Sequence, residues 1–223
     1  MNEPIRRTIV ILSGGLDSTT LLYHLRDMGH AVKALSVNYG QRHWRELEAA
    51  KRICEMTEVV HRDVDLSGLA HIFGSNALTD HSVDVPHGEY NPTTMGVTTV
   101  PNRNMILLSI ATGWAIANKF DSVAFGAHSG EYTPYPDCHP RFAAAMNCAT
   151  HVCDDVEIEV LAPFIRWNKG DIVNRGHNLG VPFESTWSCY QGGSAHCGEC
   201  STCLDRKKAF EANGLIDPVA YLA

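Results

Sequence analysis

A short run of small and hydroxyl-bearing residues follows the first apolar stretch of the chain. Thr8 to Leu12 is apolar and β-branched, as in a strand, and it leads at once into Ser13-Gly14-Gly15-Leu16-Asp17-Ser18 and an amphipathic stretch from Thr19 to Met28. Glycines between a strand and a helix let the backbone approach an anion, and the helix N-terminus supplies unpaired N–H donors and positive potential. The pattern therefore predicts a site for a phosphate or pyrophosphate.

Other nucleotide and nucleophile motifs do not fit this loop. The sequence contains no Gly-x-x-x-x-Gly-Lys-Ser/Thr loop, no Gly-x-Gly-x-x-Gly fingerprint and no Gly-x-Ser-x-Gly elbow. The alternative is a flexible turn with a capping aspartate. The candidate binding residues are Leu12, Ser13, Gly14, Gly15, Leu16, Asp17, Ser18, Thr19 and Thr20.

Four cysteines near the C-terminus have the spacing of a metal site. Cys189, Cys197, Cys200 and Cys203 form Cys-x7-Cys-x2-Cys-x2-Cys, in which the two short spacings bring thiolates onto one tight turn. A closed set of four sulfurs leaves no position for water, so the pattern favours structural zinc over a catalytic metal. An iron–sulfur cluster is the alternative, since cysteines two residues apart also occur in ferredoxins.

Composition excludes several classes of protein. The chain has 223 residues, a formal net charge of −7 and no stretch of concentrated Lys and Arg, which argues against nucleic acid as a partner. No apolar run is long enough for a membrane span, and the start of the chain does not resemble a signal peptide. We therefore expect a cytoplasmic protein whose eight cysteines do not form a disulfide framework.

The elements that must position these residues alternate between strand and helix. Strands are predicted at Thr8–Leu12, Ala31–Val37, Val59–Val64, Ser122–Phe125 and Val156–Leu161. Helices are predicted at Thr19–Met28, Trp44–Met56 and His139–Thr150. Two more helices are predicted from an Asn102 cap to Asn118 and from an Asn168–Asp171 capping box to Gly180. Such alternation predicts an α/β fold, a Rossmann-like parallel sheet with helices on both faces.

Two units and one long loop complete the expected organisation. We expect the α/β body to cover residues 1–183 and a small zinc-braced helical unit to cover 184–223. Residues 66–101 lose periodicity and gather Asp, His, Pro, Gly and Asn, which predicts a long loop over one face of the sheet. Its place after the third strand makes it a candidate lid, although an insertion without a role fits as well.

The first loop also carries a family resemblance. Ser-Gly-Gly-x-Asp-Ser resembles the PP-loop of the ATP pyrophosphatase superfamily, whose members have an adenine nucleotide alpha hydrolase-like fold and activate a substrate oxygen by adenylation. The resemblance implies ATP as cosubstrate, and it assigns Asp17 to Mg²⁺ and to the pyrophosphate leaving group.

Further motifs make this resemblance narrower, and it then covers nearly the whole chain. Val100-Pro101-Asn102-Arg103-Asn104, Tyr135-Pro136-Asp137-Cys138, Thr186-Trp187-Ser188-Cys189-Tyr190 and Cys197-Gly198-Glu199-Cys200-Ser201-Thr202-Cys203 resemble the 7-cyano-7-deazaguanine synthase family. This implies conversion of 7-carboxy-7-deazaguanine with ATP and ammonia, and zinc on the four cysteines. The family usually has Gly-Ala-Asn and then Asp-Tyr-Ser-Gly, where this chain has Gly126-Ala127-His128 and Glu131-Tyr132-Thr133-Pro134.

The chemistry implied by the resemblance needs cations and a substrate contact. Asp17, Arg103 and Lys169 are the candidate catalytic residues, with the two cations placed against phosphate or carboxylate; a solvated helix-terminal charge is the alternative for each cation. Asp137 and Tyr135 are the candidate substrate contacts, and Asp137 could equally cap a helix.

Alternatives to this function remain open. The enzyme could stop at the amide, or it could be another PP-loop enzyme that amidates or adenylates a different substrate. A module that binds nucleotide without catalysis is a third reading. We expect small-molecule substrates and a homodimer.

Overall fold

The fold is a parallel α/β sheet covered by helices on both faces. The computed structural model describes residues 5–128 and 135–222. Within them, five parallel strands pair in the order β3-β2-β1-β4-β5. They are β1 (Arg7–Ile11), β2 (Ala31–Asn38), β3 (His61–Asp65), β4 (Ser122–Ala124) and β5 (Glu159–Leu161). The predicted Rossmann-like class and all five predicted strands are confirmed.

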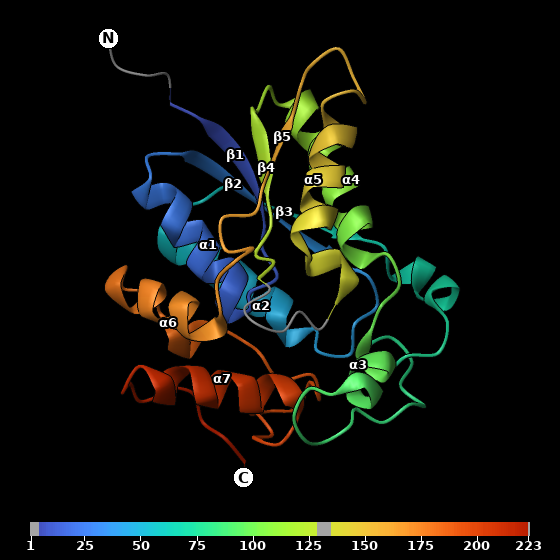
Figure 1. Cartoon of the computed structure of the whole chain (residues 1–223), viewed down its shortest axis with the longest axis vertical. Helices are drawn as coiled ribbons and strands as arrows, with labels where there is room; N and C mark the ends of the chain where they lie inside the picture. The colour runs from blue at the N-terminus through green and yellow to red at the C-terminus, as the bar shows by residue number, and fades with distance from the viewer. Residues whose placement is uncertain (1–4, 129–134, 223) are drawn as a thin grey trace.

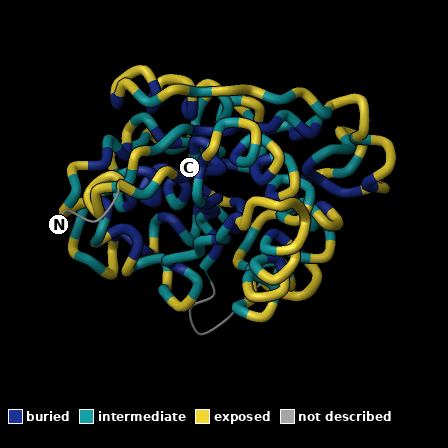
Figure 2. The backbone as a smooth tube through the Cα atoms, turned by 90° about the horizontal axis from the view of Figure 1, so that it is seen from above, coloured by how far each residue is buried: buried dark blue, intermediate teal, exposed yellow. Residues whose placement is uncertain are grey.

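Each face of the sheet has its own apolar core, because successive side chains of a strand point to opposite faces. Val10 and Leu12 pack with α1 (Leu16–Asp27), α2 (Arg45–Thr57), α6 (Lys169–Asn178) and α7 (Ser201–Ala212). Ile9 and Ile11 pack with α4 (Arg103–Ala117) and α5 (Pro140–Thr150). Figure 1 shows the two groups of helices on either side of the strands, and Figure 2 shows the buried segments running through the interior.

Helix starts follow the predicted caps in one case and differ in another. At α6 the capping box is present: Asp171 N donates to Asn168 Oδ1 and Asn168 N donates to Asp171 Oδ2, both at 2.9 Å. At α4, Asn102 and Asn118 are the two cap residues, as predicted, but the Asn102 side chain does not cap the helix. Asn102 takes a left-handed conformation with φ of 60° and makes no side-chain cap. The carboxylate of Asp137 accepts from Asn104 N at 3.2 Å instead.

The segment 66–101 contains more regular structure than its sequence predicts. It includes the 3₁₀ helix η1 (Ser67–Phe73) and the short helix α3 (Pro92–Thr98), each of seven residues and so too short to leave a clear periodic signal. Phe73, Leu78 and Val100 are buried in a cluster with Tyr39. The segment is therefore packed on the body, and its movement as a lid stays a prediction.

The C-terminal residues share the core of the body. Phe210 of α7 packs edge-on against Phe183, with ring centroids 5.1 Å apart. Phe183 lies in η3 (Phe183–Ser185), one of two further short 3₁₀ helices; the other is η2 (Pro136–Cys138). The predicted division at residue 183 therefore falls inside a continuous hydrophobic cluster.

A buried arginine ties α7 to the chain on either side of it. Arg206 is fully buried and donates from Nε and Nη2 to both carboxylate oxygens of Asp217, at 2.8 and 2.9 Å. Its Nη1 donates to Thr186 Oγ1 at 2.7 Å and its Nη2 to Phe183 O at 3.0 Å. These bonds satisfy a charge that would otherwise be costly to bury.

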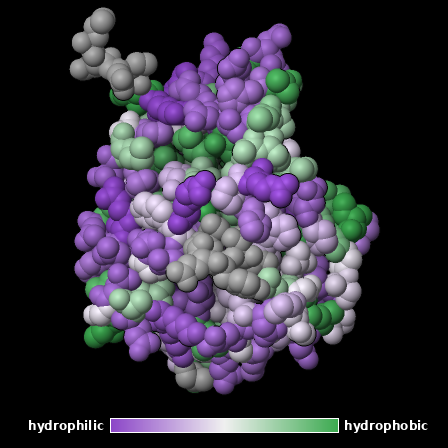
Figure 3. All heavy atoms as spheres, viewed as in Figure 1, coloured by the Kyte–Doolittle hydropathy of each residue, from purple (hydrophilic) through white to green (hydrophobic). Residues whose placement is uncertain are grey.

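The surface is largely polar on the face drawn in Figure 3, with apolar side chains scattered over it. No helix within residues 5–128 and 135–222 has the length and apolar character needed to cross a bilayer.

We expect Arg206→Met to lower the free energy of unfolding by about 3–5 kcal/mol, because it leaves the Asp217 carboxylate buried without its counter-charge. The matched control is Arg175→Met, whose partner Asp27 is half exposed, and which should cost less than about 1 kcal/mol. Urea unfolding of the zinc-loaded protein measures both. Equal losses for the two variants would contradict the role given to Arg206.

Candidate active site

A cavity of about 440 Å³ opens at the carboxyl end of the sheet. Its lining comes from the loop after β1, the ends of β2 and β4, and the first turns of α1, α4, α6 and α7. The volume lies within the range of about 300–1,000 Å³ that is usual for small-molecule sites. In parallel α/β sheets ligands bind at this edge, so the predicted PP-loop lies where it can act.

The conformation of the PP-loop is fixed by a glycine and by hydrogen bonds between its own residues. Gly14 has φ of +86°, and a Cβ there would lie 2.0 Å from the carbonyl oxygen of Glu46, so only glycine fits. Gly15 N donates to Ser13 Oγ at 3.1 Å, and Ser13 N donates to Ser18 Oγ at 3.2 Å. The first helical bond of α1 runs from Thr19 N to Gly15 O, so the N–H groups before Thr19 lie at the open end of the helix.

Not every residue predicted for this loop reaches the cavity. Leu12, Ser13, Gly15, Leu16, Asp17 and Ser18 line it. Gly14 faces α2, and Thr19 and Thr20 are fully buried in the core. These three residues pack on the side of the loop that faces the core, and they do not line the cavity.

Four charged or titratable side chains from four elements meet beside the loop. Lys169 Nζ donates to Asp17 Oδ2 at 2.5 Å, and His128 Nε2 lies 3.8 Å from the same oxygen. Asp205 Oδ2 lies 4.0 Å from Lys169 Nζ. Burial alone would raise the pKa of Asp17, but Lys169 and His128 outweigh it and the pKa is lowered. Burial lowers the pKa of His128 despite the neighbouring Asp17.

The second oxygen of Asp17 is suited to a cation. Asp17 Oδ1 is buried and has no hydrogen-bond partner within residues 5–128 and 135–222. Carboxylate oxygens are the ligands that Mg²⁺ prefers, and an ionised carboxylate that lines the cavity and keeps one oxygen unpaired fits such an ion. The predicted role of Asp17 therefore agrees with the donor that is present.

Arg103, one of the two predicted catalytic cations, also lines the cavity. Arg103 is the first residue of α4, and it lies against the hydroxyl of Tyr39, the residue that follows β2. Burial opposes its charge, but Tyr39, Asp137 and Tyr190 more than compensate, and the pKa of Arg103 is raised. Burial and Glu46 raise the pKa of Tyr39 to about 12. The site thus presents a fixed positive charge beside neutral phenols.

The two predicted substrate contacts are placed differently. Tyr135 lines the cavity, and its hydroxyl lies 3.0 Å from Thr98 Oγ1. Asp137 does not line it, because its carboxylate binds the first turn of α4. The geometry therefore favours the helix-capping alternative for Asp137, although the helix is α4 and not the one that follows it in sequence.

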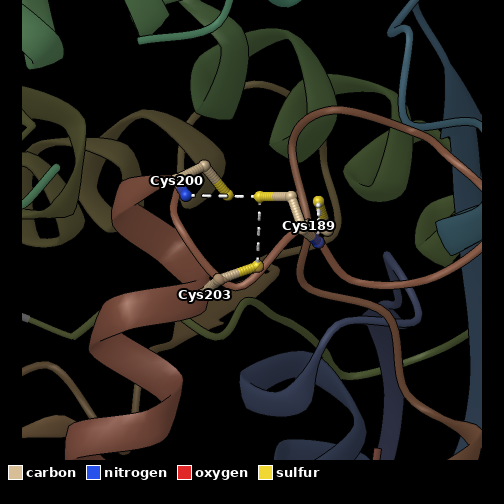
Figure 4. Close-up of side chains that lie close together, drawn as sticks. Cys189, Cys200 and Cys203 are labelled. Atoms are coloured by element: carbon tan, nitrogen blue, oxygen red, sulfur yellow. Dashed lines mark hydrogen bonds between the residues drawn. The ribbon is translucent and has the colours of Figure 1, made fainter. Parts of the chain in front are cut away.

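The four predicted cysteines gather into one metal-sized cluster. Their Sγ atoms all lie within 4.8 Å of one another, and those of Cys197 and Cys203 are 3.9 Å apart. Zinc–sulfur bonds of about 2.3 Å in a tetrahedron give sulfur pairs about 3.8 Å apart. Cys189, Cys200 and Cys203 are fully buried, and their thiol groups point toward one another in Figure 4. The cluster fits a closed structural zinc site.

Comparison with known proteins decides the family. The family model described as Queuosine biosynthesis protein QueC matches residues 7–214. A 7-cyano-7-deazaguanine synthase of Psychromonas ingrahamii is 43% identical over 216 residues, covering 97% of this chain and 98% of its own. One of Caldicellulosiruptor saccharolyticus is 46% identical over 215 residues, covering 96% and 95%.

The chain belongs to the QueC family. The family resemblance predicted from the motifs is therefore confirmed. Among solved structures, the U34-tRNA thiolase NcsA of Methanococcus maripaludis with its 4Fe-4S cluster matches with a TM-score of 0.50 and 17% identity, over 95% of this chain and 67% of that chain. This likeness concerns the fold alone.

Several residues of the cavity wall lie outside the motifs from which the site was predicted. The sequence marks His128 only as a departure from Gly-Ala-Asn, and the companion departure at Glu131–Pro134 lies outside the described residues. Tyr39 and His128 could have been found, because both follow the carboxyl end of a predicted strand. Tyr190 and Asp205 flank the cysteines in sequence, and nothing in their spacing indicates that the cysteine unit reaches the PP-loop.

We expect the purified protein to contain about one zinc per chain and to be colourless, because four buried thiolates close a tetrahedral site. Removal of the metal by a strong chelator should lower the melting temperature, since metal affinity contributes to folding. Elemental analysis with thermal unfolding measures both. A brown protein that contains iron would reverse the assignment.

Proposed function

We propose that this protein converts 7-carboxy-7-deazaguanine, ATP and ammonia into 7-cyano-7-deazaguanine, acting as a carbon–nitrogen ligase. The observation that carries the proposal is the cavity in which a PP-loop, the Asp17–Lys169 pair and Arg103 face one another. Nearly full-length relatives that are named for this synthesis support it.

The first step that the site must assist is activation of the carboxylate. A carboxylate is a poor acyl donor because oxide would have to leave, so a carboxylate oxygen attacks the α-phosphorus of ATP and pyrophosphate departs. In this proposal, the N–H groups at the start of α1 and the ammonium of Lys169 stabilise the departing charge. Mg²⁺ on Asp17 Oδ1 would supply further neutralisation of the phosphates when bound.

Nitrogen enters in the second step, and the remaining carboxyl oxygen leaves in the third. Ammonia attacks the acyl carbon, the bond to the AMP oxygen breaks, and a proton is lost to give the amide. Conversion to the nitrile needs the amide oxygen as a leaving group, so that oxygen attacks the α-phosphorus of a second ATP and pyrophosphate departs. Cleavage of the C–O bond then releases AMP, and loss of the two N–H protons gives the nitrile. Both activations have the same needs, so one site performs both.

The roles of the two cations follow from what each one contacts. Lys169 is shared between Asp17 and Asp205, and its place beside the loop suits the α- and β-phosphates. Arg103 lines the cavity beside Tyr39 and Tyr190, where a planar guanidinium suits the carboxylate of the substrate. Each cation then neutralises charge that develops during adenylation.

The proposal includes free small molecules as substrates and a cytoplasmic location. The net charge of −7 disfavours binding to a phosphate backbone. The relatives named for synthesis of a free deazaguanine support the same reading.

Mass spectrometry of the product tests the proposal directly. After incubation of 7-carboxy-7-deazaguanine with ATP, Mg²⁺ and ammonium, we expect the nitrile and release of pyrophosphate. An amide that accumulates without further reaction would mean that the enzyme stops one step earlier. Absence of both products, with bound ATP, would indicate a nucleotide-binding module.

We expect Asp17→Asn to lower turnover at least about 10²-fold while the fold is retained, because the change removes the metal-binding charge and keeps the shape of the side chain. Asp154→Asn, an exposed position outside the cavity, is the matched control and should keep wild-type turnover. Steady-state pyrophosphate release measures both. Near-normal turnover of Asp17→Asn would refute the assignment.

A further inference from the structure

The two sides of the cavity are built from different parts of the chain. One side consists of the PP-loop and apolar residues at the sheet and α4, namely Val37, Leu107 and Phe125. Another side contains Tyr90, from the segment 83–90, and Tyr190, which follows a cysteine of the metal cluster. The first side is fixed by the central core, whereas Tyr190 packs against two smaller clusters, one of which contains the cysteines.

The segment 83–90 is bound to the cysteine unit through its backbone. His87 and Cys200 form an antiparallel bridge, and Gly88 N donates to Glu199 O at 2.9 Å. Gln191 Nε2 donates to Val85 O at 3.3 Å. An ion pair between Glu89 and Lys208 of α7 adds a further link. The segment is thus paired with the two turns that carry the cysteines.

Apolar packing joins the same two parts. Ala77 and Val85 form one buried cluster with Cys189, Cys200 and Cys203, and Val85 is 3% exposed. The metal-binding thiols are therefore part of the surface on which residues 77–85 pack, while Leu78 of the same segment is buried with Tyr39 and Phe73. The positions of Ala77 and Val85 therefore depend on what holds the four sulfurs together, whereas Tyr190 also packs against the cluster of Tyr39, Phe73, Leu78 and Val100.

The wall that results is aromatic and uncharged. The hydroxyls of Tyr90 and Tyr190 lie 3.4 Å apart, and the ring of Tyr135 meets that of Tyr90 edge-on with centroids 6.2 Å apart. Aromatic rings with hydroxyl groups offer apolar faces and hydrogen bonds to a flat heterocycle.

We propose that the Tyr90–Tyr190 wall binds the bicyclic base of the substrate, and that the four-cysteine site positions this wall by anchoring residues 77–90. The inference rests on the proposed function, because it takes the second ligand of the cavity to be a deazaguanine. It gives the metal a role in substrate recognition, separate from ATP binding on the loop and sheet side.

Equilibrium binding of each ligand alone tests this division. Calorimetry measures the dissociation constants of 7-carboxy-7-deazaguanine and of α,β-methylene-ATP with Mg²⁺. We expect Tyr90→Ala to weaken binding of the deazaguanine by about tenfold or more, as for loss of a ring that stacks on a base. Binding of the ATP analogue should change less than about twofold. Tyr90→Phe restores the ring and should recover part of the lost affinity.

Two further measurements address the anchor. Val85→Ala weakens packing of the segment on the thiols without touching the cavity, so we expect about fivefold weaker deazaguanine binding and unchanged binding of the ATP analogue. Val152→Ala, at a position 82% exposed, is the matched control and should leave both constants unchanged. Removal of zinc should act like Val85→Ala and should also speed proteolysis within 77–90.

The outcomes separate this inference from the proposed function. If the wild-type protein does not bind 7-carboxy-7-deazaguanine, both are wrong. If it binds but Tyr90→Ala and Val85→Ala bind it equally well, the inference alone is overturned. Loss of affinity for the ATP analogue instead of the deazaguanine would place the nucleotide against this wall and would also overturn it. Zinc removal that weakens both ligands alike would refute the anchoring role.

Discussion

The ion pair between Lys169 and Asp17 is the contact around which the site is arranged. It joins the first residue of α6 to the first turn of α1, across 152 positions of sequence, with Nζ and Oδ2 2.5 Å apart. His128 approaches the pair from the end of β4, and Asp205 from α7. Because the pair is largely buried, its charges act strongly within the cavity, and the remaining Asp17 oxygen is left for a cation.

The sheet and the cysteine unit together hold the other parts of the site in position. The sheet fixes the PP-loop at its carboxyl edge, and the unit reaches the same loop through Trp187 N, which donates to Gly14 O at 3.0 Å. Arg206 holds α7 to Asp217 and Thr186, so the first turn of α7 cannot shift without breaking a buried charge network. A site assembled from distant segments is thereby kept rigid enough for positioning to contribute to catalysis.

The sequence predicts those features that depend on local patterns. The strands, the loop after β1, the capping box at Asn168 and the cysteine cluster all carry short-range signals. Contacts between distant segments carry none. The pairing of His87 with Cys200 and the use of Asp137 by α4 depend on how the chain folds back, and α3 is too short to show a period. Tyr90 and Tyr190 could therefore not be assigned to one wall from their spacing.

The central claim is that oxygen leaves the substrate on AMP, at the PP-loop, in both activations. It is tested most directly with 7-carboxy-7-deazaguanine that carries ¹⁸O at both carboxylate oxygens, followed by mass spectrometry of the nucleotides. The account predicts about two AMP per nitrile, each with one ¹⁸O in its phosphate. Unlabelled AMP, or ¹⁸O in inorganic phosphate together with ADP, would contradict it.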